Sequence, residues 1–275
     1  MKRLKRFFKI YIPFTHSILQ MKMSYKLDFF MGIVGQLIKC FVVYYLWKAV
    51  YINSSSYVMN SFTANEMLTY VFMSTITANI VSNTVDVSIG GEVWDGSISM
   101  NLIKPINYQV KLFFESVAEL VQGTLFIAFP IWVGLIIIRY LTVSDVPPNI
   151  TTILFYLLSS LLGFLILFLL NFIFGILSFY VTNIWGIRNL KYALLDFLSG
   201  SIVPLAFLPL CIQKVMKFVP FSSVNYVPVT IYLGKVTGSE LYKILGTQVL
   251  WIVILYIISL FVWNKAIKRL SILGG

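Results

Sequence analysis

The chain has 275 residues, of which 59% are hydrophobic and 11% are charged, and its formal net charge at pH 7 is +11. This composition leaves too little polar side chain to cover a soluble domain, so it excludes a soluble globular protein and predicts an integral membrane protein. The basic excess does not indicate a nucleic-acid partner, because most Lys and Arg residues stand at the ends of apolar runs, where they orient membrane spans.

Residues 1–27 mix basic side chains with aromatic and aliphatic ones that recur near helical spacing. The pattern predicts an amphipathic helix at the membrane surface, with its apolar residues in the headgroup boundary and its basic residues against anionic lipid. Pro13 should bend or split this helix. The alternative is a basic tail that only sets the orientation of the spans.

Apolar runs of roughly 20 residues, the length that crosses a bilayer, dominate the remainder of the chain. The sequence therefore predicts an all-α integral membrane protein, with one domain of six transmembrane helices in residues 28–275. The fifth span should be the least regular because it contains Pro204 and Pro209, and residues 213–240 should form an interfacial or re-entrant hairpin. The predicted spans cover residues 28–51, 67–87, 116–139, 151–182, 192–212 and 241–263.

The charge distribution predicts the orientation of these spans. With both termini and residues 88–112 and 183–191 on the cytoplasmic side, that side carries fourteen Lys and Arg residues and the opposite side six. Positive residues concentrate on the cytoplasmic side of membrane proteins. We therefore expect a multi-pass protein of the cell membrane with both termini in the cytoplasm. The long polar stretch SIGGEVWDGSISMNLIKPINYQVK, residues 88–111, then lies in the cytoplasm too.

Several polar residues fall inside or beside the predicted spans. Asn79, Asn83 and Asp86 have the spacing of one helical face, so they should face protein or water rather than lipid. Lys39 lies near the middle of the first span. Three acidic residues near span ends could belong to an ion path, although the favoured interpretation is that they form ion pairs with basic residues at the cytoplasmic interface. These residues are Glu115, Glu119 and Asp196, and their expected partners are Lys111, Arg188 or Lys191.

No motif for nucleotide, metal or covalent chemistry occurs in the sequence. The phosphate-loop pattern G-x-x-x-x-G-K-[ST] is absent, since Gly234 and Lys235 precede Val236. The single histidine, His16, has no neighbouring Cys or His with metal-ligand spacing. We therefore expect a chain that is not an enzyme and binds no cofactor of its own.

Two blocks of sequence carry a family resemblance. The first is residues 92–98, EVWDGSI, followed by Leu102 and by Lys104–Pro105. The second block comprises Pro204 to Pro209, Pro220–Phe221, Tyr226 to Pro228, Ile231 to Gly234, Gln248 with Trp251, and Gly274–Gly275. Both blocks together resemble the membrane-spanning permease subunits of type-2 ABC transporters, mostly exporters, in a six-helix bacterial subfamily.

In that family the loop after the second span forms a coupling helix that docks on a separate ATPase subunit. The resemblance implies that two ATPase subunits, which hold ATP and Mg, assemble with this chain and with a second permease, identical or paralogous. Trp94 is added here as an apolar anchor, because a large aromatic side chain in a polar loop suits docking. The positions that match the family pattern are Glu92, Asp95, Gly96, Leu102 and Pro105.

The resemblance also places spans two and five along the substrate path. The cargo should be hydrophobic or amphipathic, such as a drug, an antimicrobial peptide, a lipid or a glycan, because the spans offer mainly apolar side chains. The alternative function is an ion-coupled carrier that uses Lys39 and Asp196 as a charge relay. The candidate path residues are Asn79, Asn83, Ser199, Gly200, Ser201 and Pro204.

Overall fold

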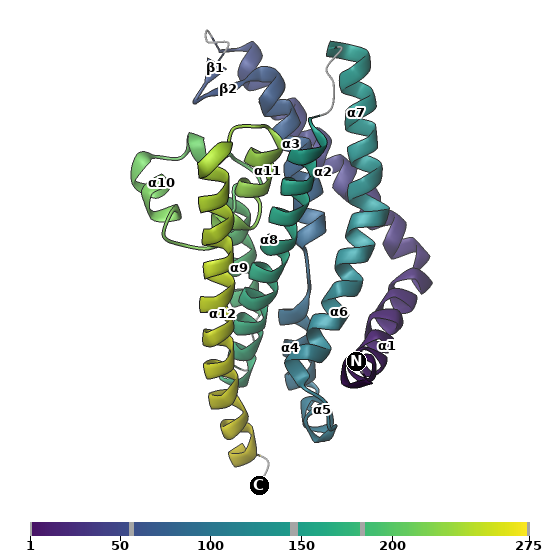
Figure 1. Ribbon diagram of the computed structural model, residues 1–275. Coiled ribbons are helices and arrows are strands. Elements are labelled where there is room, and N and C mark those ends of the chain that lie inside the picture. Colours follow the sequence, from purple (N-terminus) through teal and green to yellow (C-terminus); the bar gives the residue numbers. More distant parts are fainter. Residues whose placement is uncertain (1, 55–57, 144–147, 182–184, 274–275) are drawn as a thin grey trace.

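Helices that run along one long axis form most of the molecule (Figure 1). This computed structural model describes residues 2–54, 58–143, 148–181 and 185–273, so the closing Gly274 and Gly275 of the resemblance lie outside the described residues. The turn between α4 (Val85–Trp94) and α5 (Ile98–Ile103) lies at one end, toward which both termini also lie, and the hairpin of β1 (Val58–Met59) and β2 (Phe62–Thr63) lies at the other. We call these the α5 end and the hairpin end.

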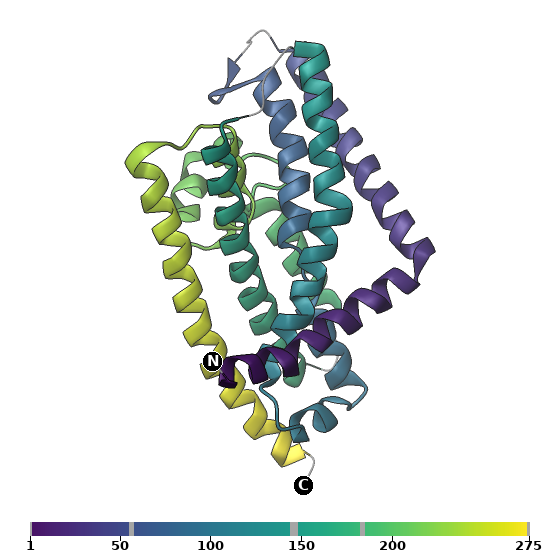
Figure 2. The same cartoon turned by 45° about the vertical axis from the view of Figure 1, so that its right-hand side comes forward.

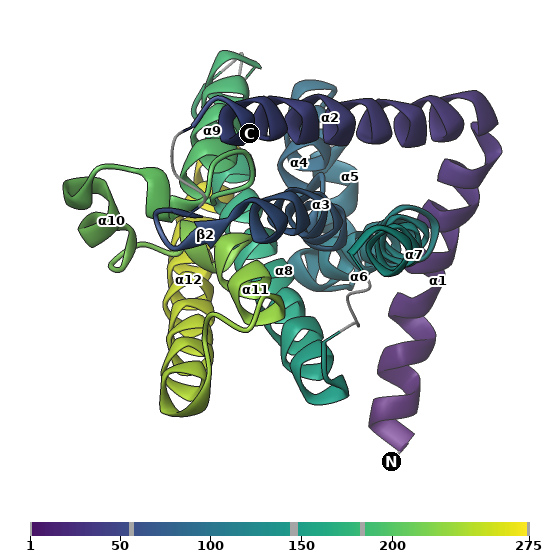
Figure 3. The same ribbon diagram turned by 90° about the horizontal axis from the view of Figure 1, so that it is seen from above.

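The first two helices lie on the outside of the bundle. α1 (Lys2–Ser24) forms the predicted helix and runs through Pro13 without a break, so of the two predicted effects of Pro13, a bend or a split, the split does not occur. It crosses the bundle obliquely near the α5 end, and α2 (Lys26–Ile52) turns away from it toward the hairpin end (Figure 2). Seen from above, α1 and α2 form two sides of an open corner around the other helices (Figure 3).

The predicted second span is interrupted. After β1 (Val58–Met59) and β2 (Phe62–Thr63), α3 (Ala64–Val81) ends before a three-residue break, and α4 (Val85–Trp94) begins beyond it. Asn79, Asn83 and Asp86 therefore do not share one helical face, contrary to the prediction. The predicted loop is also largely helical, with α5 (Ile98–Ile103) inside it and α6 (Tyr108–Gln122) starting before its end.

The segment predicted as the third span begins earlier than expected, at Tyr108. α6, the π-helical turn η1 (Gly123–Ala128) and α7 (Phe129–Val143) follow one another without a break. Gly123 allows α3 to approach closely, because a Cβ at this position would lie 2.2 Å from the carbonyl oxygen of Asn79. A glycine at such a crossing lets two helices touch through their backbones.

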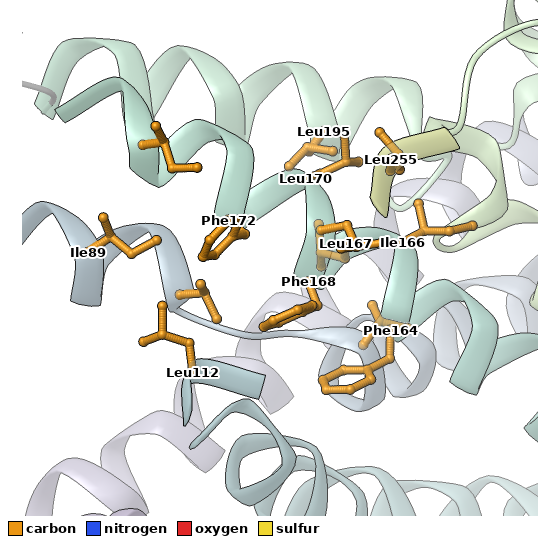
Figure 4. Packing of buried hydrophobic residues seen from close by; sticks show 14 of the residues in the cluster. Ile89, Leu112, Phe164, Ile166, Leu167, Phe168, Leu170, Phe172, Leu195 and Leu255 are labelled. Carbon is orange, nitrogen blue, oxygen red and sulfur yellow. The ribbon is translucent and has the colours of Figure 1, made fainter. Parts of the chain in front are cut away.

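α8 (Ile150–Ile176) is the central helix, and it is followed by the short turn η2 (Leu177–Phe179). Its side chains meet those of α4, α6, α9 (Trp185–Leu198) and α12 (Gly238–Leu273) in one apolar cluster (Figure 4). Phe172 of α8 and Ile89 of α4 are both fully buried there. This packing fixes the start of α4 against the centre of the molecule.

The predicted fifth span is not one helix. α9 begins in the predicted loop and ends at Leu198, after which Gly200 adopts a left-handed conformation with φ of +81°. Pro204 and Pro209 cannot donate backbone hydrogen bonds, so a regular helix does not resume. The elements that follow are η3 (Leu205–Phe207), α10 (Leu210–Met216), η4 (Phe221–Ser223) and α11 (Tyr226–Tyr232).

Polar side chains of α3 satisfy this irregular backbone. The Tyr70 hydroxyl donates to the Gly200 carbonyl at 2.5 Å, and the Ser74 hydroxyl donates to the Ser201 carbonyl at 2.8 Å. Asn225 donates to the Ser74 carbonyl at 2.9 Å. Non-helical backbone persists at membrane depth only where protein groups provide such partners. α11 then packs on α8 and α3, so it belongs to the interior rather than to the membrane surface alone.

Within the described ranges, four helices are long and apolar enough to cross a membrane. α3 and α9 are not among them, because α9 has 14 residues and α3 is rich in Ser, Thr and Asn. The structure thus bears out an all-α membrane protein and leaves the layout of six spans as a prediction. The four segments are Phe30–Ile52, Tyr108–Leu141, Ile150–Phe179 and Gly238–Lys268.

Candidate coupling element and polar cavity

α4 and α5 form a helix-turn-helix at the α5 end. Gly96, with φ of +78°, reverses the chain between them, a conformation that a Cβ would strain. Asp95 accepts a hydrogen bond from the backbone N–H of Ser97 at 2.9 Å. Hydrogen bonds from the Ser97 side chain and backbone hold the pKa of Asp95 below its usual range. Asp95 and Gly96, both predicted as site residues, therefore shape the turn.

Three large apolar side chains of this helix-turn-helix are exposed, one at the end of α4 and two on α5. Trp94 is 84% exposed, Met100 is 68% exposed and Ile103 is 80% exposed. The sequence predicted the role of Trp94 but not those of Met100 and Ile103, although both are apolar residues in an otherwise polar stretch. A group of exposed apolar side chains at a polar end marks an interaction surface. Pro105 is also exposed, whereas Leu102 is half-buried against the central cluster.

The Glu92 carboxylate contacts side chains of α6 and does not join the exposed apolar side chains of the helix-turn-helix. It accepts hydrogen bonds from the Tyr108 hydroxyl at 2.6 Å and from the Lys111 ammonium at 3.0 Å. Lys111 also pairs with Glu115 at 3.5 Å, as predicted for that acidic residue. The Tyr108 ring stacks on Trp263 of α12, with centroids 5.0 Å apart. Glu92 thus braces α4 against α6.

Glu119 joins three elements at the break between α3 and α4. One carboxylate oxygen accepts from the Thr84 backbone N–H at 2.7 Å, and the other accepts from the Thr84 hydroxyl at 2.5 Å and from Lys22 of α1 at 2.6 Å. The predicted partners of Glu119 did not include Lys22. α1 is further fixed by the Thr15 hydroxyl, which donates to the Phe114 carbonyl at 2.6 Å. The amphipathic helix is therefore attached to the same break as α4.

A buried ion pair links α4 to α9. The Lys191 ammonium lies 2.5 Å from Asp86, and the two side chains are 2% and 3% exposed. Lys191 also donates to Asn171 of α8 at 2.8 Å, and Asn171 donates to both the backbone and side-chain oxygens of Asn83 at 2.9 Å. This cluster of Asp86, Lys191, Asn171 and Asn83 closes the break between α3 and α4. We call it the buried polar cluster.

A cavity of ≈160 Å³ lies beside the buried polar cluster. Three of the predicted path residues line it, namely Asn83, Ser199 and Ser201. Asp196 lies on the same cavity and accepts a hydrogen bond from the Ser201 hydroxyl at 3.3 Å, rather than pairing with Arg188 or Lys191.

The other predicted path residues are not among the described residues that line the cavity. The Asn79 amide is turned back to the Thr75 carbonyl at 2.8 Å. Gly200 and Pro204 hold the irregular turn beyond α9. Lys39 is exposed on α2, which lies on the outside of the bundle.

The apolar helices and their buried polar contacts define a multi-pass membrane protein. The model of one protein family, described as ABC-2 family transporter protein, matches residues 37–274. The chain therefore belongs to the ABC-2 family of transporter proteins and is a membrane permease subunit of an ABC transporter. Membership implies a membrane component, generally non-catalytic, that associates with ATPase subunits. A search of curated proteins found no match.

Proposed function

We propose that this permease is the membrane half of an ATP-driven exporter, and that the helix-turn-helix of α4 and α5 receives the motion of an ATPase. The observation that supports this proposal is the exposure of Trp94, Met100 and Ile103 on a short helix-turn-helix, which Glu92 holds against α6. A rigid element with an apolar tip can dock on a partner and move without deforming. Both termini and this turn would lie in the cytoplasm.

The contacts around α4 provide a route for that motion. A displacement of α4 acts on α6 through Glu92 and Lys111, and on α9 through Asp86 and Lys191. α9 leads directly to Ser199 and the cavity of ≈160 Å³. The turn and the cavity are therefore connected by packed helices and hydrogen bonds rather than by flexible loops.

Two copies of a permease, identical or paralogous, would enclose the path, with two ATPase subunits binding ATP and Mg. The cavity combines aliphatic walls with amide and hydroxyl groups, which suits an amphipathic cargo with hydrogen-bonding groups. The bilayer surrounds the apolar helices, and no nucleic acid enters this mechanism.

The test is ATPase association after removal of the apolar tip. Trp94→Ala should weaken binding of the ATPase that co-purifies from native membranes by roughly 30-fold or more, because exposed Trp side chains are frequent interface hot spots. A Trp94→Ala, Asp95→Ala double variant should weaken it further, since Asp95 also shapes the turn. The measurement is the ATPase dissociation constant and the rate of coupled hydrolysis in proteoliposomes.

Phe218→Ala is the matched control, because Phe218 is an aromatic residue 78% exposed outside the turn. It should leave ATPase binding unchanged. Unchanged ATPase association in the double variant would contradict the proposed role of the turn. If instead no ATPase co-purifies, and transport continues in ATP-depleted vesicles under an ion gradient, the ion-coupled carrier with Lys39 and Asp196 is favoured.

A further inference from the structure

A second and larger cavity, of ≈570 Å³, lies between α10, α11 and the first turns of α12. These elements lie toward the hairpin end, away from α5 (Figure 1). Its walls are mainly apolar, with Met216, Val227 and Ile244 among the contributors, and hydroxyl groups lie between them. The volume is that of a site for a small ligand. Nothing in the proposed coupling mechanism uses it.

Most of the charged side chains that line this cavity are basic. Lys217, Lys235 and Lys243 line it, together with the single carboxylate of Glu240. Lys235 is occupied, because it donates to the Ser61 carbonyl at 2.7 Å and pairs with Glu66 at 3.1 Å. Lys217 and Lys243 are exposed, and the described part of the chain places no ion-pair partner within 4.0 Å of either ammonium group. The cavity therefore has two cationic groups available against one anionic group.

The position of these lysines is itself unusual for a membrane protein. The predicted topology leaves six Lys and Arg residues on the side opposite the termini, and three of them line this one cavity. Positive residues are disfavoured on that side. Their concentration around a single cavity indicates a local anionic ligand rather than a role in orientation.

The depth of the cavity identifies the kind of ligand. α12 is a candidate span that begins at Gly238, so Lys243 lies about 8 Å and Thr247 about 14 Å along the helix from its start. The cavity thus extends from headgroup depth into the upper acyl region. Cationic groups at its rim and apolar walls below match the phosphate and the acyl chains of a phospholipid.

We propose that this cavity binds an anionic phospholipid, with Lys217 and Lys243 at its phosphate and the acyl chain along the apolar wall that includes Ile244. The site is independent of ATPase docking and of the cavity beside the buried polar cluster. Glu240 opposes the ligand charge, so it keeps the affinity below the maximum that the two lysines would give.

The test is lipid binding to the detergent-purified full chain, measured by native mass spectrometry. Dioleoyl phosphatidylglycerol should bind about tenfold more tightly than dioleoyl phosphatidylcholine. A Lys217→Gln, Lys243→Gln double variant should lose affinity for phosphatidylglycerol by roughly 30-fold, since each surface lysine contributes about fivefold. The matched control is Lys48→Gln with Lys214→Gln, which removes two exposed lysines that do not line the cavity.

Two further variants separate a binding role from a structural one. Glu240→Gln should strengthen phosphatidylglycerol binding by a few fold, an increase that loss of structure would not give. Thr247→Trp should block the acyl region of the cavity and weaken binding of phosphatidylglycerol although both lysines remain. Equal binding of the two lipids, or equal loss in the control variant, would overturn the proposal. Displacement of the lipid by inorganic phosphate at similar concentration would also overturn it, because the site would then recognise a free anion.

Discussion

The α5 end and the middle of the molecule are held together by different polar chemistry. Around α4, charged groups make the connections, with Glu92, Lys111 and Glu115 on one side and Asp86 with Lys191 on the other. Farther along the bundle, neutral groups replace them. Gln248 of α12 is fully buried, accepts from the Ser159 hydroxyl and donates to the Ser159 and Ser223 carbonyls.

This difference follows from the cost of charge in an apolar medium. A charged group deep in hydrocarbon is expensive, whereas an amide or hydroxyl can be satisfied by a few hydrogen bonds. A buried ion pair adds little net stability, because desolvation of the two charges offsets their attraction. Removing one partner is nevertheless costly, because the other charge then stays buried alone. The ion pairs of α4 with α6 and α9 should therefore oppose any displacement of α4 that separates their charges.

The largest effect is expected from Lys191→Ala. The variant leaves the Asp86 carboxylate buried without its cation, and one of its oxygens already has no hydrogen-bond partner among the described residues. Breaking a buried pair from one side costs about 3–5 kcal/mol. The measurement is the free energy of unfolding of the purified chain in denaturant.

Lys22→Ala is the control, since it also removes a lysine from an ion pair near α4 but at a side chain 31% exposed. It should cost about 1 kcal/mol or less. A Lys191→Ala, Asp86→Ala double variant should recover part of the loss of the single variant. If Lys191→Ala and Lys22→Ala have equal effects, burial of the Asp86–Lys191 pair does not raise the cost of breaking it.

An intermediate effect is expected from Gln248→Leu in the neutral region. The substitution keeps a similar volume but leaves Ser159 and the Ser223 carbonyl without their partner. Loss of partners for buried neutral groups costs about 1–3 kcal/mol. The same unfolding measurement applies. Thr247→Val, which removes a hydroxyl bonded only to its own helix in the described structure, should change stability by about 0.5 kcal/mol or less.

The smallest effect is expected at the hairpin end, from the pH dependence of Glu66. Partial burial raises the pKa of Glu66, but hydrogen bonds from Thr63 and Lys235 outweigh it and the net pKa is lowered. A carboxyl group with a lowered pKa stabilises the fold above its unfolded pKa, and this contribution is lost as the pH falls through the folded value. Acidification below about pH 4.3 should therefore remove it.

The measurement is the difference in melting temperature between the native chain and Glu66→Gln at several pH values. The native chain should be the more stable at neutral pH, and the two should converge in acid. Glu240→Gln provides the comparison, because its carboxylate has no ion pair in the described part of the chain. A difference for Glu66 that does not change with pH would show that the ionised form of Glu66, held by Thr63 and Lys235, contributes nothing to stability.

Much of the fold could be predicted from the chain. Long apolar runs predict α2, α8 and α12. The break after Val81 and the end of α9 at Leu198 could not be placed, because each depends on polar partners from elsewhere in the chain. Asn171 of α8 supports the first break, and Tyr70 of α3 supports the second.

The candidate site shows the same division. The large aromatic side chain of Trp94 in a polar stretch predicts a docking residue, and the charge count predicts that it lies on the same side of the membrane as both termini. The pair of Lys111 with Glu115 was among those predicted, but the pairs of Lys111 with Glu92 and of Lys22 with Glu119 were not, because each joins elements that only the packing of helices brings together. The sequence by itself determined a membrane permease with a polar element between the segments predicted as its second and third spans. Only the tertiary structure decided that Asp86 and Lys191, 105 residues apart, join that element to α9, because helix packing brings such distant groups together.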